Sequence, residues 1–253
     1  MKNRKIWVML VGLFTALTSG FMGTTLTFAE ENEASQTIEQ PSYISDFPNQ
    51  VGHWQDLVGT AEKKNDSAGL WIANTKQGTN LESVSINLDA REQSSGDLEL
   101  TFLYEGQSNF GLVFRGDKQK TSQWQSFAYN RDGCWQLGQP GGKWLTNIPG
   151  PTLLSGQQYK LLVRYDGKKI QTFLNDQLFY ENEEVHYPDG TSINDDWMGA
   201  VGIRLFGNLS KLNIISMKSG SVGSIPVIDS SAEYRELKEK WRNQLVSDRK
   251  SVV

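Results

Sequence analysis

Between residues 115 and 144 the sequence concentrates side chains of the kinds that hold sugars. A sugar ring stacks its C–H face on an aromatic platform, and its polar groups pair with planar groups such as guanidinium and carboxylate. Arg115 ends an apolar stretch, so a strand there would aim a fixed fork of donors at the rim of a sheet. The complete set of candidate binding residues is Glu105, Arg115, Asp117, Trp124, Tyr129, Trp144 and Arg204.

The surroundings of these candidates indicate how each would be presented. Trp124 and Trp144 lie in polar stretches, so we expect them to be exposed in loops, where tryptophan more often binds than fills space. Arg204 alternates with apolar neighbours and would face solvent, an internal ion pair or a concave polar face. Glu105 follows a tyrosine at a turn and could pair with such an arginine. Trp71 and Trp135 are expected to be core residues.

A catalytic alternative rests on acidic residues. Asp97 and Glu99 occupy alternate positions of one predicted strand and would point to the same face. Retaining glycoside hydrolysis needs two carboxylates about 5 Å apart, so a glycoside hydrolase acting through a sandwich cleft remains an alternative. The next alternate position of this strand holds Thr101 and not a third carboxylate. Asp97 and Glu99 are therefore interpreted as part of a solvated outer face of a sheet. The acidic cluster at 181–184 near His186 is interpreted as a loop rim, and no catalytic residue is assigned.

Composition excludes several other classes of function. The net charge of -4 and a pI near 5.3 argue against a nucleic-acid partner, which would require a basic surface. Cys134 is the single cysteine, so no intrachain disulfide forms. The two histidines lie far apart without cysteines, which argues against structural zinc. No cofactor is implied and no metal residue is assigned, although Asp56 and the pair Asp195-Asp196 are weak candidates for a structural calcium site.

The elements that must position the candidates are predicted to be strands. Alternating apolar and polar residues recur between 47 and 218, for example at 81–88, 97–104 and 110–115, with turn signals between them. Asp-Gly pairs at 132–133 and 166–167 and Asn-Asp at 175–176 mark hairpin turns. These stretches predict an all-β fold of about a dozen strands, a two-sheet antiparallel jelly-roll sandwich.

The N-terminal segment is predicted to be an export signal. A positive start, an apolar stretch over 6–22 and small residues at 27 and 29 indicate a signal peptide over 1–29. Residues 30–46 are polar and are interpreted as a flexible spacer. A retained transmembrane anchor is the alternative, although the apolar stretch is barely long enough and glycines interrupt it. Export without a disulfide fits a Gram-positive bacterium, so we expect a protein that is secreted or held at the cell surface, without a membrane partner after cleavage. We also expect a monomer.

The C-terminal segment changes from a Gly/Ser/Pro linker at 219–229 to a helical pattern at 230–247. Tyr234, Leu237, Trp241 and Leu245 share one face of this predicted helix. A lone amphipathic helix buries too little to be stable, so it either docks on the sandwich or lacks its partners. Residues 248–253 correspond in frame to a common sequencing adapter. We therefore expect a helix that begins a truncated domain, with poor packing over 230–253.

Two resemblances follow from these patterns. The stretches FGLVFRGD (110–117), CWQLG (134–138), YKLLVRYDGKKIQTFLNDQLFYE (159–181) and GAVGIRLF (199–206) resemble the concanavalin-like sandwiches of carbohydrate-binding module family 66. This resemblance implies a non-catalytic module for a polysaccharide, and known members suggest levan. The GAVGIRLF strand also has a fold-level likeness to 3-keto-disaccharide hydrolases.

The stretch EYRELKEKWRNQL (233–245) resembles the opening helix of family 8 polysaccharide lyases, which include hyaluronate, chondroitin and xanthan lyases. Members of that family cleave uronic-acid polysaccharides by β-elimination, with catalytic residues carried much further along the chain. The resemblance therefore implies that this chain is not itself an enzyme but targets an appended lyase to its glycan. The expected partner is a levan-type fructan or a uronic-acid glycosaminoglycan, and a surface adhesin or spacer without a sugar site is the remaining alternative.

Overall fold

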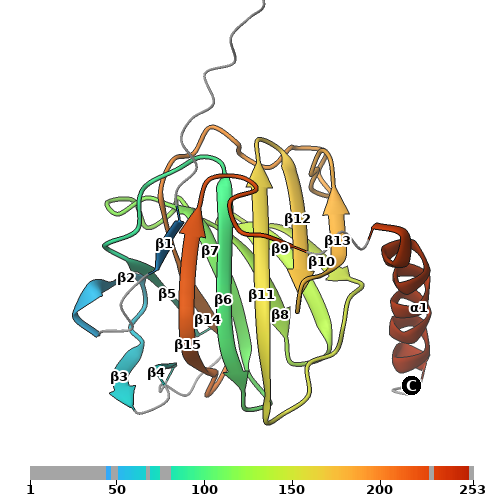
Figure 1. Cartoon of the computed structure of the whole chain (residues 1–253), viewed down its shortest axis with the longest axis horizontal. Helices are drawn as coiled ribbons and strands as arrows, with labels where there is room; N and C mark the ends of the chain where they lie inside the picture. Colours follow the sequence, from blue (N-terminus) through green and yellow to red (C-terminus); the bar gives the residue numbers. More distant parts are fainter. Residues whose placement is uncertain (1–43, 47–50, 67–68, 75–80, 228–230, 251–253) are drawn as a thin grey trace, which may run out of the picture. The chain divides into compact units, whose positions relative to one another are not determined.

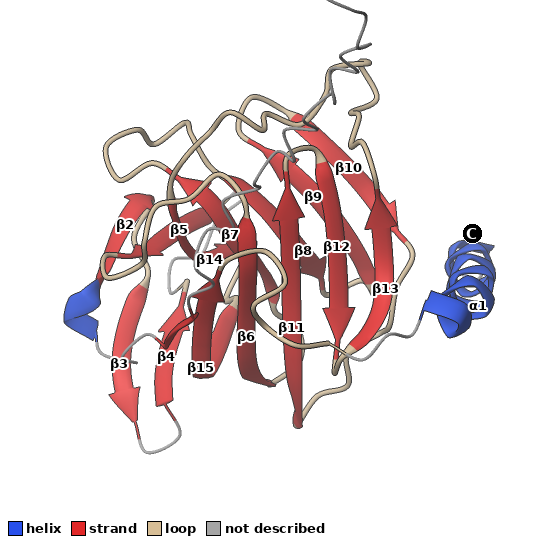
Figure 2. Cartoon of the chain, turned by 45° about the horizontal axis from the view of Figure 1, so that its top comes forward, coloured by secondary structure: helices blue, strands red, loops and turns tan. Residues whose placement is uncertain are grey.

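The chain forms two antiparallel sheets that lie face to face, followed by one helix (Figure 1; Figure 2). The computed structural model describes residues 44–46, 51–66, 69–74, 81–227 and 231–250. Over these residues the prediction of an all-β, two-sheet antiparallel sandwich is confirmed. Residues 1–43, where the signal peptide and most of the spacer were predicted, lie outside the described residues. The described part contains no helix that is long and apolar enough to cross a membrane.

Each sheet combines consecutive strands with strands that are distant in sequence. One sheet has the order β13 (Gln177–Asn182), β12 (Lys169–Leu174), β11 (Gln157–Asp166), β6 (Gly96–Tyr104), β15 (Lys211–Gly220), β4 (Gly69–Ala73) and β3 (Glu62–Asp66), with β1 (Ile44–Asp46) paired to β15. The other has the order β10 (Lys143–Ile148), β9 (Cys134–Gln139), β8 (Gln125–Asn130), β7 (Asn109–Gly116), β14 (Ala200–Phe206), β5 (Glu82–Asn87) and β2 (Trp54–Val58). A 3-10 helix, η1 (Val51–His53), precedes β2. We call these the β6 sheet and the β7 sheet.

The predicted hairpin turns have the backbone that their residues favour. Gly133 and Gly167 have φ values of 85° and 53°, and Asn175 and Asp176 have φ values of 51° and 68°. Two consecutive left-handed residues give a turn whose twist matches that of the flanking strands β12 and β13. Glycine, asparagine and aspartate tolerate this conformation better than other residues, which is why the turns could be read from the sequence.

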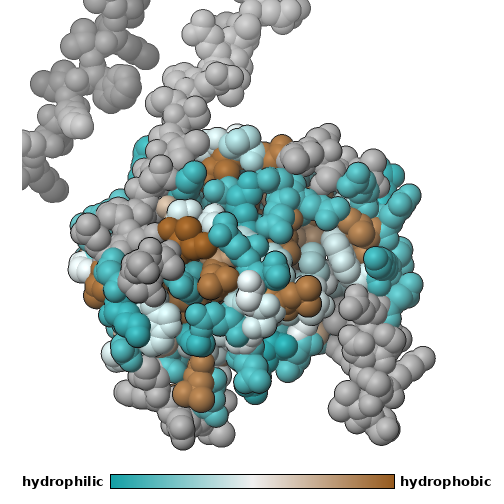
Figure 3. All heavy atoms as spheres, turned by 60° about the horizontal axis from the view of Figure 1, so that its bottom comes forward, coloured by the Kyte–Doolittle hydropathy of each residue, from teal (hydrophilic) through white to brown (hydrophobic). Residues whose placement is uncertain are grey.

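Aromatic side chains fill the space between the sheets. Phe102 of β6 lies 4.8 Å from Phe110 of β7, measured between ring centroids, and Phe127 and Phe179 surround Trp135 at 5.6 and 4.8 Å. Trp135 is fully buried, as predicted, whereas Trp71 is only half-buried and lies under Lys64 rather than in the core. On the face shown in Figure 3, hydrophobic residues form small groups separated by hydrophilic ones, as expected when alternation turns apolar side chains inward.

The buried tyrosines predict a loss of stability at alkaline pH. Burial raises the pKa of Tyr129 to about 12 from its ordinary value of 10.0. The unfolded chain therefore releases this proton at lower pH than the folded protein, so stability falls as the pH rises from 10 to 12, by about 2–3 kcal/mol in total. Urea denaturation at pH 8 and pH 11 should show a smaller loss in Tyr129→Phe than in the unchanged protein. Equal losses in the two proteins would contradict this prediction.

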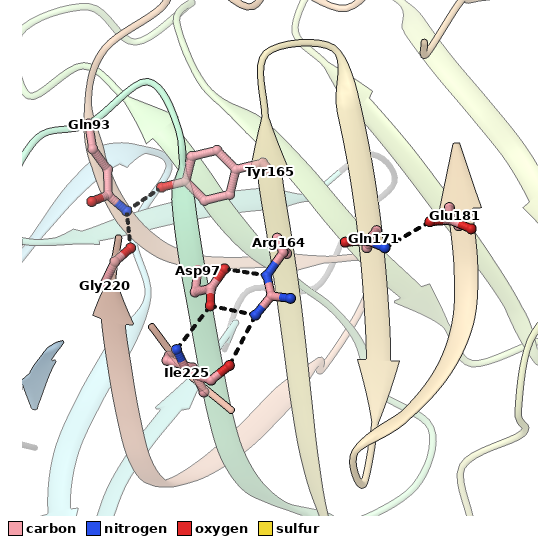
Figure 4. A network of polar contacts seen from close by, with 8 residues as sticks. All are labelled: Gln93, Asp97, Arg164, Tyr165, Gln171, Glu181, Gly220 and Ile225. Carbon is pink, nitrogen blue, oxygen red and sulfur yellow. Dashed lines mark hydrogen bonds and ion pairs between the residues drawn. The ribbon is translucent and has the colours of Figure 1, made fainter. Parts of the chain in front are cut away.

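The residues after β15 are bound to the outer face of the β6 sheet. The Asp97 carboxylate of β6 accepts two hydrogen bonds from Arg164 of β11, at 2.8 and 2.9 Å (Figure 4). The same pair holds Ile225, whose N–H donates to Asp97 at 3.0 Å and whose carbonyl accepts from Arg164 at 3.0 Å. Ile225 is buried, so the predicted linker is anchored at this position. Its first two residues, Ser219 and Gly220, also belong to β15.

The helix α1 (Ser231–Lys250) packs beside β13 (Figure 1). Tyr234 and Trp241 are buried, and the Trp241 ring meets Phe179 of β13 edge-on, with centroids 6.2 Å apart. The Tyr234 hydroxyl accepts a hydrogen bond from the Glu181 backbone N–H at 3.1 Å. Over residues 233–243, whose burial the structure describes, the helix thus differs from the expected poor packing, because Tyr234 and Trp241 are buried against the sandwich. The side chain of Leu245 lies outside the described residues.

Candidate functional site

A pocket of about 630 Å³ lies on the outer face of the β7 sheet. The loop between β7 and β8 forms one wall, the hairpin between β9 and β10 another, and β2 a third. The lining residues are Leu57, Val58, Gly59, Glu82, Thr121, Ser122, Trp124, Pro140, Gly141, Gly142, Trp144 and Arg204. Three of the predicted binding residues, Trp124, Trp144 and Arg204, therefore meet in one place.

Small residues on the sheet make room for these large side chains. Arg204 of β14 pairs with Gly111 of β7, which in turn pairs with Ala128 of β8. Gly138 of β9 pairs with Trp144 of β10, and a Cβ atom at Gly138 would lie 2.0 Å from the indole ring. Because these positions carry little or no side chain, the Trp144 indole can lie across the sheet toward Arg204.

The guanidinium of Arg204 is surrounded by aromatic rings. Its central carbon lies 4.2 Å from the ring centroid of Trp144, 4.2 Å from that of Phe206 and 5.5 Å from that of Trp124. Such cation–π contacts stabilise a charge that has little access to water. Burial lowers the pKa of Arg204, while the charge of Glu82 acts in the opposite direction. The site is thus a desolvated cation held under aromatic faces.

Glu82 of β5 completes the site and is a residue that sequence reasoning missed. Its Oε1 accepts a hydrogen bond from Nε of Arg204. The two residues are 122 positions apart in sequence and meet because β5 and β14 pair with Arg204 opposite Val84. The one available signal was the position of Glu82 at the start of a predicted strand, and that signal did not point to a partner.

The two tryptophans differ in exposure. Trp144 is half-buried and offers part of its ring to the pocket. Trp124 is only 2% exposed, so the expectation that it is exposed is wrong. Its Nε1 donates to the Thr121 carbonyl at 3.1 Å, and its ring lies 6.2 Å from that of Trp144. Trp124 therefore acts as a supporting wall, and Trp144 is the accessible aromatic surface.

Arg115 does not lie in the pocket, although the sequence placed it at a rim. It is fully buried and donates to the backbone carbonyls of Ser94, Gly167 and Asn194 at 2.6, 2.7 and 3.2 Å. The pairing of β14 with β7 shifts register here, and Arg115 has a φ of 55°. This bulge turns the side chain away from the rim where the end of the strand was expected to place it. Arg115 is therefore not exposed at a rim, where the sequence analysis expected it.

Tyr129, Asp117 and Glu105 also lie outside the pocket lining. Tyr129 is 1% exposed and accepts a hydrogen bond from the Leu153 N–H at 3.1 Å, so it lies in the core. Asp117 accepts from the Gln119 N–H, which lowers the pKa of its carboxyl, and shapes the loop before Trp124. Among the described residues, Glu105 forms its ion pair with Lys211 rather than with an arginine.

The acidic residues considered for catalysis and calcium are engaged elsewhere. Asp97 is fully buried and bound to Arg164 and Ile225, and Glu99 is also buried, so neither offers an open carboxylate on a cleft. Asp56 accepts hydrogen bonds from Lys63 and Ser85. Across the described residues no group of three or more His, Cys, Asp or Glu side chains could hold a metal ion.

Solved structures share the general sandwich architecture. A carbohydrate-binding module of family 66 from Bacillus subtilis matches 63% of this chain and 94% of its own, at 17% identity and a TM-score of 0.46. An endo-β-galactosidase from Clostridium perfringens matches 70% of this chain and 62% of its own, at 11% identity and a TM-score of 0.47. At these identities the likeness concerns the fold alone. No protein-family profile matches the chain.

The curated relative is far more similar. A hyaluronate lyase of Enterococcus faecalis is 99% identical to this chain over 247 residues, which are 98% of this chain. The chain spans about a quarter of the length of that relative, 25%. The resemblance to polysaccharide lyases that was expected from residues 233–245 is thereby confirmed, and the chain is nearly identical to one quarter of a hyaluronate lyase.

Proposed function

We propose that this chain is a secreted carbohydrate-binding module that keeps a polysaccharide lyase on its glycan. The observation that carries the proposal is the pocket in which the half-exposed Trp144 lies beside the Arg204–Glu82 pair. An aromatic face beside fixed polar groups suits the alternating C–H faces and hydroxyls of a sugar. The near identity to part of a hyaluronate lyase supports a glycan such as hyaluronan as the ligand. Binding at a second site would raise the effective concentration of the enzyme at its polymer.

A binding screen with the full chain tests this function. Levan, inulin, hyaluronan, chondroitin and xanthan would be titrated while tryptophan fluorescence and heat release are followed. Saturable binding of one glycan without turnover is the expected result. Product formation that disappears on changing Asp97 or Glu99 would favour the hydrolase alternative. No binding of any glycan would favour the spacer alternative.

The variant Trp144→Ala should lose most of the affinity for that glycan. Truncating a central aromatic anchor typically costs about 2 kcal/mol or more, which corresponds to a loss of roughly 30-fold in affinity. Isothermal titration of the variant against the unchanged protein measures this loss. Trp71→Ala is the matched control, because Trp71 is a half-buried tryptophan on the β6 sheet and outside the pocket. Equal losses in both variants would contradict the assignment of the pocket.

A further inference from the structure

In the pocket, the carboxylate of Glu82 is more accessible to a ligand than the guanidinium of Arg204. The side chain of Glu82 is 31% exposed, and that of Arg204 is 9% exposed. Glu82 uses its Oε1 to hold Nε of Arg204, and in the described part of the chain no residue donates to its Oε2. A ligand that enters the pocket therefore meets an oriented carboxylate oxygen with unused acceptor capacity.

The positive charge of Arg204 is shielded from a ligand. The rings of Trp144 and Phe206 each lie 4.2 Å from the guanidinium carbon. Nη1 is buried and has no hydrogen-bond partner among the described residues. A carboxylate approaching from solvent would encounter Glu82 first, and two like charges in such a setting repel each other.

The remaining polar groups of the pocket are neutral. Thr121 and Ser122 are exposed and contribute hydroxyl groups from the loop between β7 and β8. Of the lining residues that the structure describes, Glu82 and Arg204 alone carry charge, and their charges cancel. The pocket therefore has no net charge with which to select an anion.

We propose that this pocket takes an uncharged sugar ring rather than the carboxylate of a uronic acid. Adjacent hydroxyl groups of the ring donate to Glu82, and its C–H face stacks on Trp144. In a polymer of alternating hexosamine and uronate units, the occupant is the uncharged unit, and the uronate carboxylates remain in solvent. This inference rests on the proposed function and specifies the ligand of the same site.

Carboxyl-reduced oligosaccharides test the inference directly. Hyaluronan oligosaccharides of one length would be titrated into the full chain before and after reduction of their carboxylates to primary alcohols, with levan and inulin oligosaccharides alongside. We expect the affinities for the reduced and the unreduced hyaluronan oligosaccharides to agree within about twofold. A tenfold change would correspond to about 1.4 kcal/mol of binding free energy. Binding of neutral fructans alone would also support the inference.

The contrary outcomes separate the inference from the proposed function. A tenfold or larger loss of affinity on reduction, in binding that still requires Trp144, would overturn the inference and leave the proposed function intact. No Trp144-dependent binding of any oligosaccharide would overturn both.

The variant Glu82→Gln provides a second test of the acceptor. It keeps the shape of the side chain but removes its charge, so binding of the reduced and of the unreduced oligosaccharide should each weaken about tenfold. Glu105→Gln is the matched control, since Glu105 pairs with Lys211 outside the pocket. Thermal midpoints would verify that both variants fold, and equal affinities in Glu82→Gln and the unchanged protein would overturn the inference. Should Glu82→Gln fail to fold, the comparison of reduced and unreduced ligands on the unchanged protein still decides.

Discussion

Replacing Arg115 by Met is expected to lower the free energy of unfolding by about 3–5 kcal/mol, because three partly buried carbonyl groups lose this donor, at about 1–3 kcal/mol for each one left unpaired. These are the backbone carbonyls of Ser94, Gly167 and Asn194, which Arg115 ties together at one end of the sandwich. Methionine has a similar reach but no donor. Urea denaturation monitored by tryptophan fluorescence measures the effect, and for a domain of this size the melting temperature should fall by roughly 10 °C.

The control for this prediction is Arg131→Met, which changes an exposed arginine in the turn after β8 and should alter stability by less than about 0.5 kcal/mol. The folded fraction of Arg115→Met should still bind the glycan, since Arg115 is buried outside the pocket. A variant that is as stable as the unchanged protein but no longer binds would instead place Arg115 in the sugar site.

Replacing Arg164 by Met should cost about 3–5 kcal/mol, because it leaves the buried carboxylate of Asp97 without its cation. The Asp97 hydrogen bond raises the pKa of Arg164, so this guanidinium is charged throughout the accessible pH range. The variant also removes the donor to the Ile225 carbonyl. We therefore expect faster proteolysis within residues 221–227 as well as a lower denaturation midpoint.

Lys169→Met is the matched control on the neighbouring strand β12. Lys169 pairs with Glu181 and Glu183 near the surface, and such exposed ion pairs contribute about 0–1 kcal/mol. Limited proteolysis followed by mass spectrometry identifies the cleavage sites in both variants. If Arg164→Met and Lys169→Met are cleaved at the same rate within 221–227, Asp97 and Arg164 do not anchor this segment.

Local sequence patterns determined most of the architecture. Alternation over 97–104 and 110–115 predicted strands that the structure places in β6 and β7, because a strand that buries one face requires a period of two. Asp-Gly and Asn-Asp pairs predicted the hairpins, since these residues accept positive φ at low cost. The helix at α1 was also predicted from its periodicity, and the start of that helix carried the resemblance to polysaccharide lyases.

The tertiary structure alone decided which candidate residues form the site. Trp144 and Arg204 were found by residue type, but Glu82 became part of the site only because β5 pairs with β14 across 122 positions of sequence. The bulge at Arg115 turned its side chain away from the rim where the sequence placed it, and a positive φ at an arginine, unlike one at asparagine or aspartate, has no signature in the sequence.

Asp97, which was considered for catalysis, also shows what the sequence could not predict. Alternation on β6 correctly put its side chain on the outer face of the sheet, where a carboxylate is expected to meet solvent. The segment after β15 covers that face and binds Asp97 and Arg164 through the backbone of Ile225. A sequence pattern reports which face a side chain takes, because that depends on local geometry. What covers the face depends on contacts between residues distant in sequence, and only the folded chain determines these.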